Sequence, residues 1–223
     1  MAGQMVSFPS NGGQAQGYLA VPQSGRGPGV IVIQEWWGLV PHIKDVCDRF
    51  AREGFTALAP DLFHGKTTTE PDEAGKLMMA MKIDEAARDM GGAFDYLKQS
   101  DACTGKVGDV GFCMGGGLAL VLATQKPLDA CVSYYGVLQS TPDFSKLTGP
   151  VLGHYAENDG WANPDAAHRL EQQIRDAGKH AQFYIYTGTD HAFFNDTRPE
   201  VYNRAAAELS WERTLAFFNE HLR

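Results

Sequence analysis

A cysteine lies between two glycines in the run Gly111-Phe112-Cys113-Met114-Gly115. An apolar run at 106–110 precedes this motif and a helix-like run at 116–125 follows it. The order matches the G-x-S-x-G turn that joins a strand to a helix and carries a nucleophile, with cysteine in place of serine. Glycines leave room for such a sharp turn. Two interpretations of Cys113 are open at this point, a nucleophile or a small buried hydrophobic residue.

If Cys113 is the nucleophile, the turn should present its thiol to solvent above the sheet. The amides at the start of the following helix would then point at the same place, where they favour negative charge. We therefore expect the Met114 N–H to donate to an oxyanion that forms next to the thiol.

Two later strands end in groups that complete this chemistry. The expected strand at 151–156 leads into Glu157-Asn158-Asp159, and the expected strand at 183–186 is followed at loop distance by His191. Reactive side chains gather at the carboxyl ends of parallel strands, and the chain order Cys, Asp, His is that of the α/β-hydrolase triad. We interpret His191 as the base and Asp159 as the acid that orients it. The rival acids are Glu157, Asp165 and Asp190.

Glu35 follows the β-branched run at 30–33, beside Trp36 and Trp37. Such a run is typical of a strand buried on both faces, and a carboxylate there must be paired or held neutral. Two interpretations remain open: Glu35 is a second proton acceptor for the Cys113 thiol, or it forms an ion pair that fixes the loop. The Trp36 N–H is the expected second oxyanion donor.

Strands and helices alternate along the chain, which is typical of βαβ units and a mostly parallel sheet. The sequence predicts an α/β-hydrolase fold, a twisted sheet of about eight strands flanked by helices, as a single domain over residues 1–223. Residues 62–81 are expected to be irregular. The expected strands cover 4–8, 15–21, 30–33, 55–59, 106–112, 130–135, 151–156 and 183–186. The expected helices cover 42–53, 83–98, 116–125, 165–177 and about 200–221, the last with an apolar stripe of Trp211, Leu215, Phe218 and Leu222.

The charge pattern excludes several classes of partner. The chain has 27 Asp and Glu against 19 Lys and Arg, a net charge of -8, and no cluster of basic residues. Nucleic acid and anionic membrane surfaces are therefore not expected as partners. No signal peptide pattern or membrane-spanning run is seen, so a cytoplasmic protein is expected, as a monomer or alternatively a dimer.

The cysteine and histidine spacings do not indicate a metal or cofactor site. The four cysteines form no C-x-x-C pair, and Cys47 and Cys131 are expected to be reduced core thiols. No helix carries histidine and acid at ligand spacing, and no phosphate-binding loop is present. We expect no metal and no cofactor.

Taken together, these motifs resemble the dienelactone hydrolase (carboxymethylenebutenolidase) family over nearly the whole chain. The resemblance implies a triad of Cys113, His191 and Asp159, and a Glu35 that contacts the resting thiol and helps to deprotonate it. It also implies that Tyr134 and Tyr135 line the substrate pocket. The motifs are Gln34-Glu35-Trp36-Trp37-Gly38, Pro60-Asp61-Leu62, Gly111-Phe112-Cys113-Met114-Gly115-Gly116, Tyr134-Tyr135-Gly136, Asn158-Asp159 and Asp190-His191-Ala192-Phe193.

One departure from the family bears on the substrate. Family members that act on dienelactone hold its carboxylate with arginines, one of them four residues after the catalytic histidine. Asn195 occupies that place here, and the segment 62–81 contains no arginine. Lysine offers no bidentate fork for a carboxylate, and aromatic residues suggest an apolar pocket: Trp36, Trp37, Phe63, Trp161, Phe193 and Phe194. The prediction is a broader small-molecule ester or lactone substrate; the alternatives are an acyltransferase or thioesterase, and a redox-sensing or binding protein.

Overall fold

A computed structural model of the protein describes residues 3–10, 12–138 and 140–223. The chain divides into two compact units, Met1–Asp109 and Val110–Arg223. Strand β5 (Cys103–Phe112) begins in the first unit and ends in the second. A single domain over residues 1–223 stays a prediction.

The first unit contains the antiparallel edge of the sheet. Its strands are β1 (Gln4–Ser10), β2 (Gly13–Ala20), β3 (Gly27–Ile33) and β4 (Thr56–Pro60), and they follow the order β1-β2-β4-β3-β5. β1 and β2 form an antiparallel hairpin, β2 pairs antiparallel with β4, and β4 pairs parallel with β3. β3 is buried along its whole length, as its β-branched run predicts.

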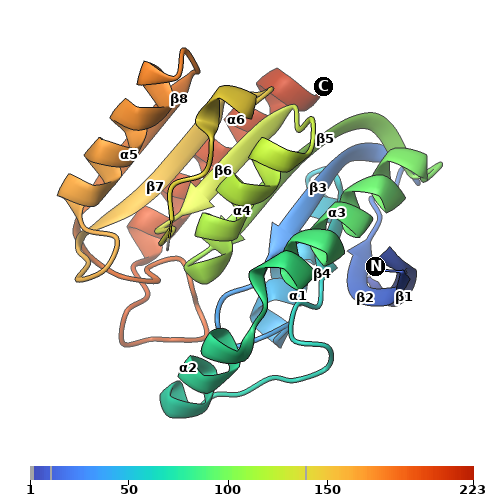
Figure 1. Ribbon diagram of the computed structural model, residues 1–223, viewed down its shortest axis with the longest axis horizontal. Coiled ribbons are helices and arrows are strands. Elements are labelled where there is room, and N and C mark those ends of the chain that lie inside the picture. The colour runs from blue at the N-terminus through green and yellow to red at the C-terminus, as the bar shows by residue number, and fades with distance from the viewer. Residues whose placement is uncertain (1–2, 11, 139) are drawn as a thin grey trace. The chain divides into compact units, whose positions relative to one another are not determined.

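Three helices belong to this unit: α1 (Pro41–Arg52), α2 (Pro71–Ala80) and α3 (Ile83–Gln99). α1 and α3 pack against the strands, whereas α2 lies at the margin of the unit with Ala74 as its buried residue (Figure 1). The prediction that 62–81 is irregular is therefore wrong for 71–80. Pro71 in the first turn, followed by Asp72 and Glu73, favours a helix start at this point.

The second unit is the parallel part of the sheet. Its strands β6 (Ala130–Tyr134), β7 (Val151–Asn158) and β8 (Ala181–Asp190) follow the end of β5 in the order β5-β6-β7-β8. β6, β7 and β8 pair in parallel. Helices α4 (Met114–Gln125) and α5 (Pro164–Asp176) cover one face of these strands and α6 (Arg204–Leu222) covers the other (Figure 1). A short 3₁₀ turn, η1 (Phe144–Lys146), precedes β7.

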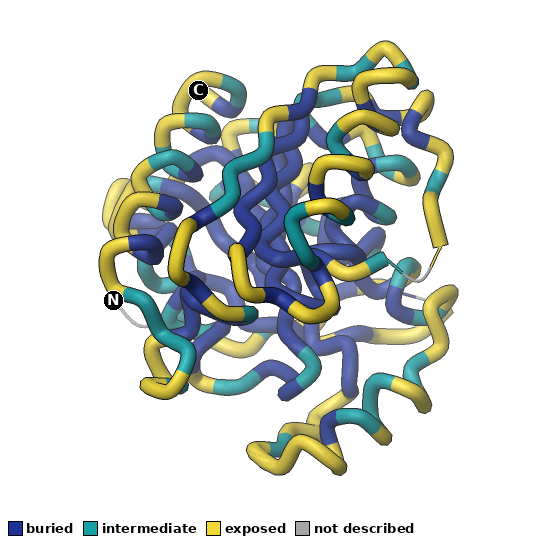
Figure 2. Tube along the Cα trace, turned by 90° about the vertical axis from the view of Figure 1, so that its left-hand side faces the viewer, coloured by how far each residue is buried: buried dark blue, intermediate teal, exposed yellow. Residues whose placement is uncertain are grey.

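Buried residues form the interior and exposed residues lie on the outside, as Figure 2 shows for the trace coloured by burial. α4 is buried along most of its length. The expected sheet of eight strands in an α/β arrangement is confirmed. In the part of the chain that the structure describes, no helix is both long and apolar enough to cross a bilayer.

The buried face of α6 differs from the expected apolar stripe. Phe218 and Leu222 are buried, but Trp211 and Leu215 are only half-buried. Two hydroxyl residues of α6, Ser210 and Thr214, are buried in addition. The helix presents these hydroxyl groups to the interior, where they find hydrogen-bond partners. Hydrophobic periodicity does not detect such a face, because it counts serine and threonine as polar.

Candidate active site

Cys113 lies at the junction of β5 and α4 in a strained backbone conformation. Its φ is 55°, in a region that residues other than glycine rarely adopt and that is concentrated at functional sites. A Cβ on Gly111 would lie 1.9 Å from the carbonyl oxygen of Gly115, so glycine is required where the strand turns into the helix. The Cys113 N–H donates to the Tyr134 carbonyl at 3.0 Å, which ties the turn to the end of β6.

The thiol is less open to solvent than the sequence suggested. Cys113 is 8% exposed, so the expectation that it points freely into solvent is wrong. The segment after β6 packs closely on the start of α4: a Cβ on Gly116 would lie 2.7 Å from the Gly136 Cα, and one on Gly117 would lie 2.0 Å from the Val137 carbonyl oxygen. Access to the sulfur is therefore narrow.

Asp159 and His191 are brought together from the ends of β7 and β8. Asp159 Oδ2 and His191 Nδ1 are 2.6 Å apart, and the Asp159 side chain is fully buried. The other oxygen, Oδ1, accepts the backbone N–H groups of Trp161 at 2.8 Å and Ala162 at 2.9 Å. Burial alone raises the pKa of Asp159, but the bond to His191 and these two N–H groups outweigh it and the pKa is lowered.

The three rival acids lie elsewhere. Glu157 is exposed and accepts the Gly188 N–H at 2.8 Å. Asp190 is exposed at the end of β8, and Asp165 lies in the first turn of α5. None of these carboxylates takes the place of Asp159 on the histidine ring.

His191 is half-buried and favours its protonated form. Burial by itself lowers its pKa, but the hydrogen bond to Asp159 and the interaction with the Cys113 sulfur raise the pKa to about 10. Nε2 has no aligned hydrogen-bond partner among the residues that the structure describes. The sulfur therefore acts on the ring at close range, without a formed hydrogen bond, and Nε2 remains available to a reacting group.

Aromatic rings flank the histidine on two sides. The Tyr135 ring lies 5.0 Å from the His191 ring, and the Trp161 ring lies 5.4 Å from it in an edge-to-face arrangement. Tyr135 is fully buried and has a φ of 39°, whereas Trp161 is 61% exposed. Trp161 is thus an apolar surface at the mouth of the site.

Two other residues predicted to line the pocket lie deeper. Tyr134 is fully buried, and its hydroxyl lies 2.8 Å from Thr214 Oγ1. Phe193 is fully buried and packs on Tyr135 at 5.5 Å and on Tyr186 at 5.0 Å between ring centroids. These rings support the residues next to His191, and their role as pocket walls stays a prediction.

The remaining predicted residues belong to the first unit. Glu35 follows β3 and is 1% exposed, and the rings of Trp36 and Trp37 lie 5.0 Å apart in the same loop. Phe63 lines a cavity of about 120 Å³ together with residues of the 62–86 segment, among them Leu77 and Met81. The roles of Glu35, Trp36, Trp37 and Phe63 stay predictions.

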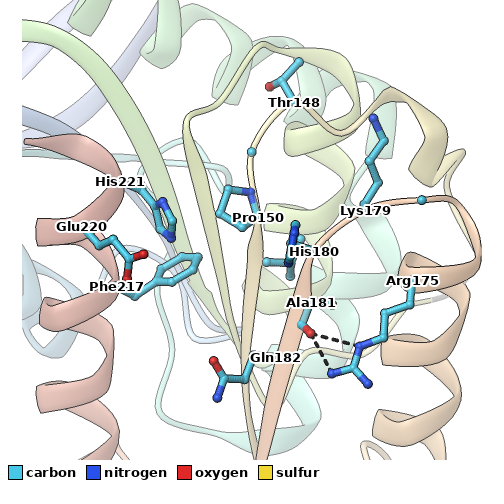
Figure 3. A pocket seen from close by; sticks show the side chains of 13 residues that line it. Thr148, Pro150, Arg175, Lys179, His180, Ala181, Gln182, Phe217, Glu220 and His221 are labelled. Carbon is cyan, nitrogen blue, oxygen red and sulfur yellow. Dashed lines mark hydrogen bonds between the residues drawn. The ribbon is translucent and has the colours of Figure 1, made fainter.

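A larger hollow lies away from this chemistry. It has a volume of about 740 Å³ at the amino ends of β7 and β8, next to the end of α6 (Figure 3). Two cations in its wall are bound to the protein itself: Lys179 donates to the Leu147 carbonyl and Arg175 to the Ala181 carbonyl. No residue of the proposed triad lines it.

The parallel sheet with a strained cysteine at the strand-to-helix turn, followed in the chain by an aspartate and a histidine in contact, defines an α/β-hydrolase. Comparison with known proteins agrees. The model of the dienelactone hydrolase family matches residues 15–222. The chain belongs to the dienelactone hydrolase family, and it is a hydrolase of that type.

Individual relatives are similar over almost their whole length. "Protein usf" of Aquifex pyrophilus is 41% identical, with 99% of both chains covered. A protein of Aquifex aeolicus provisionally named carboxymethylenebutenolidase is 37% identical, covering 99% of this chain and 100% of its own. The crystal structure of a protein of Klebsiella pneumoniae provisionally named dienelactone hydrolase has a TM-score of 0.88 at 30% identity, covering 97% of this chain and 98% of that one.

Proposed function

We propose that this protein hydrolyses a small lactone or carboxylic ester through a thioester on Cys113. The observation that carries the proposal is the Asp159–His191 contact at 2.6 Å, together with the effect of the Cys113 sulfur on the same ring. A nucleophile, a base and a group that orients the base are the parts that covalent acyl transfer requires.

The proposed reaction has two halves. In the first half the sulfur attacks the substrate carbonyl carbon as a thiolate, with its proton held on His191 Nε2, and His191 then gives this proton to the leaving alkoxide. In the second half His191 takes a proton from water, the resulting hydroxide attacks the thioester, and the proton goes back to the departing thiolate. Asp159 stays ionised throughout and stabilises the imidazolium, in keeping with its lowered pKa.

Backbone amides would stabilise the tetrahedral oxyanion in both halves. Met114 is the first residue of α4, so its N–H lies at the helix end where positive potential is concentrated. Stabilisation of the oxyanion by such a hydrogen-bond donor is worth roughly 3 kcal/mol for each donor. The Trp36 N–H as second donor, and Glu35 as a second proton acceptor for the thiol, remain predictions from the sequence and the family resemblance.

The proposed substrate is an uncharged ester or lactone. Asn195, which stands where related enzymes acting on dienelactone place an arginine, is buried and bonded to Thr197 Oγ1 at 2.6 Å and to its N–H at 3.1 Å. It therefore offers no cation to a substrate carboxylate. The exposed Trp161 instead offers apolar surface beside the base.

The test is turnover of p-nitrophenyl acetate and of a set of short lactones by the wild type and by Cys113→Ala. We expect the variant to lose turnover, and the wild type to show, by intact mass after rapid quenching, an adduct of one acyl group. Wild-type-like activity of Cys113→Ala would contradict the proposal. Product transfer to an added alcohol would indicate the acyltransferase alternative, and reversible peroxide oxidation of Cys113 without any turnover would indicate the redox sensor.

A further inference from the structure

The second unit contains a buried polar cluster that the proposed reaction does not use. At its centre is His154, which lies inside β7 and is fully buried. Its Nδ1 lies 2.8 Å from the Tyr186 hydroxyl, and its Nε2 lies 3.1 Å from Thr214 Oγ1. Thr214 is also 2.8 Å from the Tyr134 hydroxyl, so one imidazole links residues of β6, β8 and α6.

The cluster is built around a neutral ring. Burial, and then the charge of Arg213, lower the pKa of His154 to about 3. A neutral imidazole has one donor and one acceptor nitrogen, which suits two hydroxyl partners that can each donate or accept. An apolar residue could fill the same space on an interior strand. The presence of a polar ring is therefore explained by the two hydroxyl groups that it fixes by hydrogen bonds.

Both ends of the cluster reach the segments that carry and flank His191. Tyr186 packs on Phe193 at 5.0 Å between ring centroids, and Phe193 is two residues after the base. Tyr134 packs on Phe193 at 6.4 Å and is followed directly by Tyr135, whose ring lies 5.0 Å from His191. The hydrogen bonds of His154 therefore fix two neighbours of the base at once.

The turn that holds the base needs such support. Ala192 and Tyr135 both have positive φ, of 66° and 39°, and conformations of this kind persist only where the surrounding structure enforces them. The Asn203 N–H also fixes this turn by donating to the Phe193 carbonyl at 3.0 Å. Packing through Phe193 adds a second constraint, on the side of the sheet covered by α6.

We propose that His154 is a positioning residue for His191, acting through Tyr186 and Thr214 on the Phe193 and Tyr135 rings. It never contacts the substrate and never exchanges a proton in the reaction. The proposal rests on the proposed function insofar as His191 is the catalytic base.

The test compares His154→Leu, which removes both ring hydrogen bonds, with Thr214→Val, which keeps the shape and removes only the shared hydroxyl. We expect kcat to fall roughly 10- to 100-fold in His154→Leu and severalfold in Thr214→Val, with KM changed less than about twofold, because misplaced catalytic groups slow the chemical step. The double variant should be no slower than His154→Leu, since both changes break one linkage.

The matched control is Thr56→Val in the first unit. Thr56 is fully buried and its hydroxyl donates to the Ala102 carbonyl at 2.6 Å, so this variant also loses one interior hydrogen bond. It should lower the melting temperature without changing kcat. If the melting temperature also falls in the His154 and Thr214 variants while their kcat stays at the wild-type value, the positioning role is overturned.

A second measurement is independent of turnover. The Nδ1 proton of His191 in its short bond to Asp159 should give a downfield NMR signal, assigned by its loss in Asp159→Asn. We expect this signal to broaden or shift in His154→Leu and Thr214→Val but not in Thr56→Val. An unchanged signal in both variants would overturn the proposal. If the wild type shows no esterase activity but the signal still shifts in the two variants, only the proposed function is rejected. If His154→Leu does not fold, the kcat and the NMR signal of Thr214→Val alone test the positioning role.

Discussion

Two histidines of the second unit, the half-buried His191 and the fully buried His154, lie in opposite electrostatic surroundings. His191 contacts the carboxylate of Asp159 and is influenced by the Cys113 sulfur, and its pKa is raised to about 10. His154 contacts two hydroxyl groups, and burial together with the positive charge of Arg213 lowers its pKa to about 3. Burial lowers the pKa of both rings, so the charge of the partners decides the direction.

In the proposed function, this difference corresponds to two different roles for an imidazole. A ring that binds a proton readily and has one free nitrogen can exchange protons with a substrate. A ring that stays neutral over the working pH range keeps its hydrogen bonds unchanged while the chemistry proceeds beside it. Four changes would break or sharpen this comparison.

The largest effect is expected for His191→Gln. Loss of the base should lower kcat/KM for p-nitrophenyl acetate by roughly 10²- to 10⁴-fold, because the group that gives the proton to the leaving alkoxide is removed. The matched control is His180→Gln, an exposed histidine before β8, which should keep wild-type kinetics. Equal activity of the two variants would exclude His191 as the base.

Asp159→Asn should remove the negatively charged partner that distinguishes the surroundings of His191 from those of His154. The amide carries no charge, so the pKa of His191 should fall toward its ordinary value, and kcat/KM should fall roughly 10²-fold. An NMR titration of the ring measures the first effect and steady-state kinetics the second. A His191 that still titrates near pH 10 in this variant would show that Asp159 is not the main cause.

Stability should depend on pH through His191. A pKa that is higher in the folded state means that the folded chain binds the extra proton more tightly, so this stabilisation is complete below pH 6.5 and is lost as the pH rises toward 10 and beyond. Urea unfolding at pH 6, 8 and 10 should show a steeper decline for the wild type than for His191→Gln. Parallel declines would contradict the assigned shift. His154 should not add to the pH dependence of the free energy of unfolding between pH 8 and 10, because its ring is neutral there in both states.

The smallest effect is expected for Arg213→Met. The guanidinium carbon lies 3.7 Å above the Tyr184 ring and Nη1 donates to the Tyr186 hydroxyl at 3.1 Å. Loss of the cation–π contact should cost about 0.5–1 kcal/mol in urea unfolding. The pKa of His154 should rise slightly without reaching its ordinary value, because burial is the first cause of its shift. Arg204→Met, an exposed change on the same helix, should leave stability unchanged.

The residues of the proposed triad could be predicted from the sequence because their signals are local. The glycine spacing around Cys113, and the position of Asp159 and His191 just after apolar runs, follow from the turns that any parallel sheet makes at its carboxyl edge. The structure adds what spacing cannot supply, namely that one carboxylate oxygen of Asp159 contacts His191 Nδ1 while the other accepts two backbone N–H groups.

The parts that sequence reasoning missed depend on contacts between distant segments. His154 is an interior strand position, and nothing near it in the chain indicates that Thr214, 60 residues later, faces it. The buried face of α6 was placed wrongly for the same reason, since hydroxyls count as polar in a periodic pattern. The exposure of Cys113 was overestimated because close packing of 134–137 on α4 is a tertiary feature.

The Asp159 carboxylate has a consequence for how the enzyme can diversify. One oxygen contacts His191 Nδ1 and the other accepts the main-chain N–H of Trp161, with no contact to the indole side chain needed for either bond. Replacement of the indole by other side chains therefore leaves the anchor in place. Substitutions at residue 161 should therefore change substrate preference beside His191 while the Asp159–His191 contact stays in place.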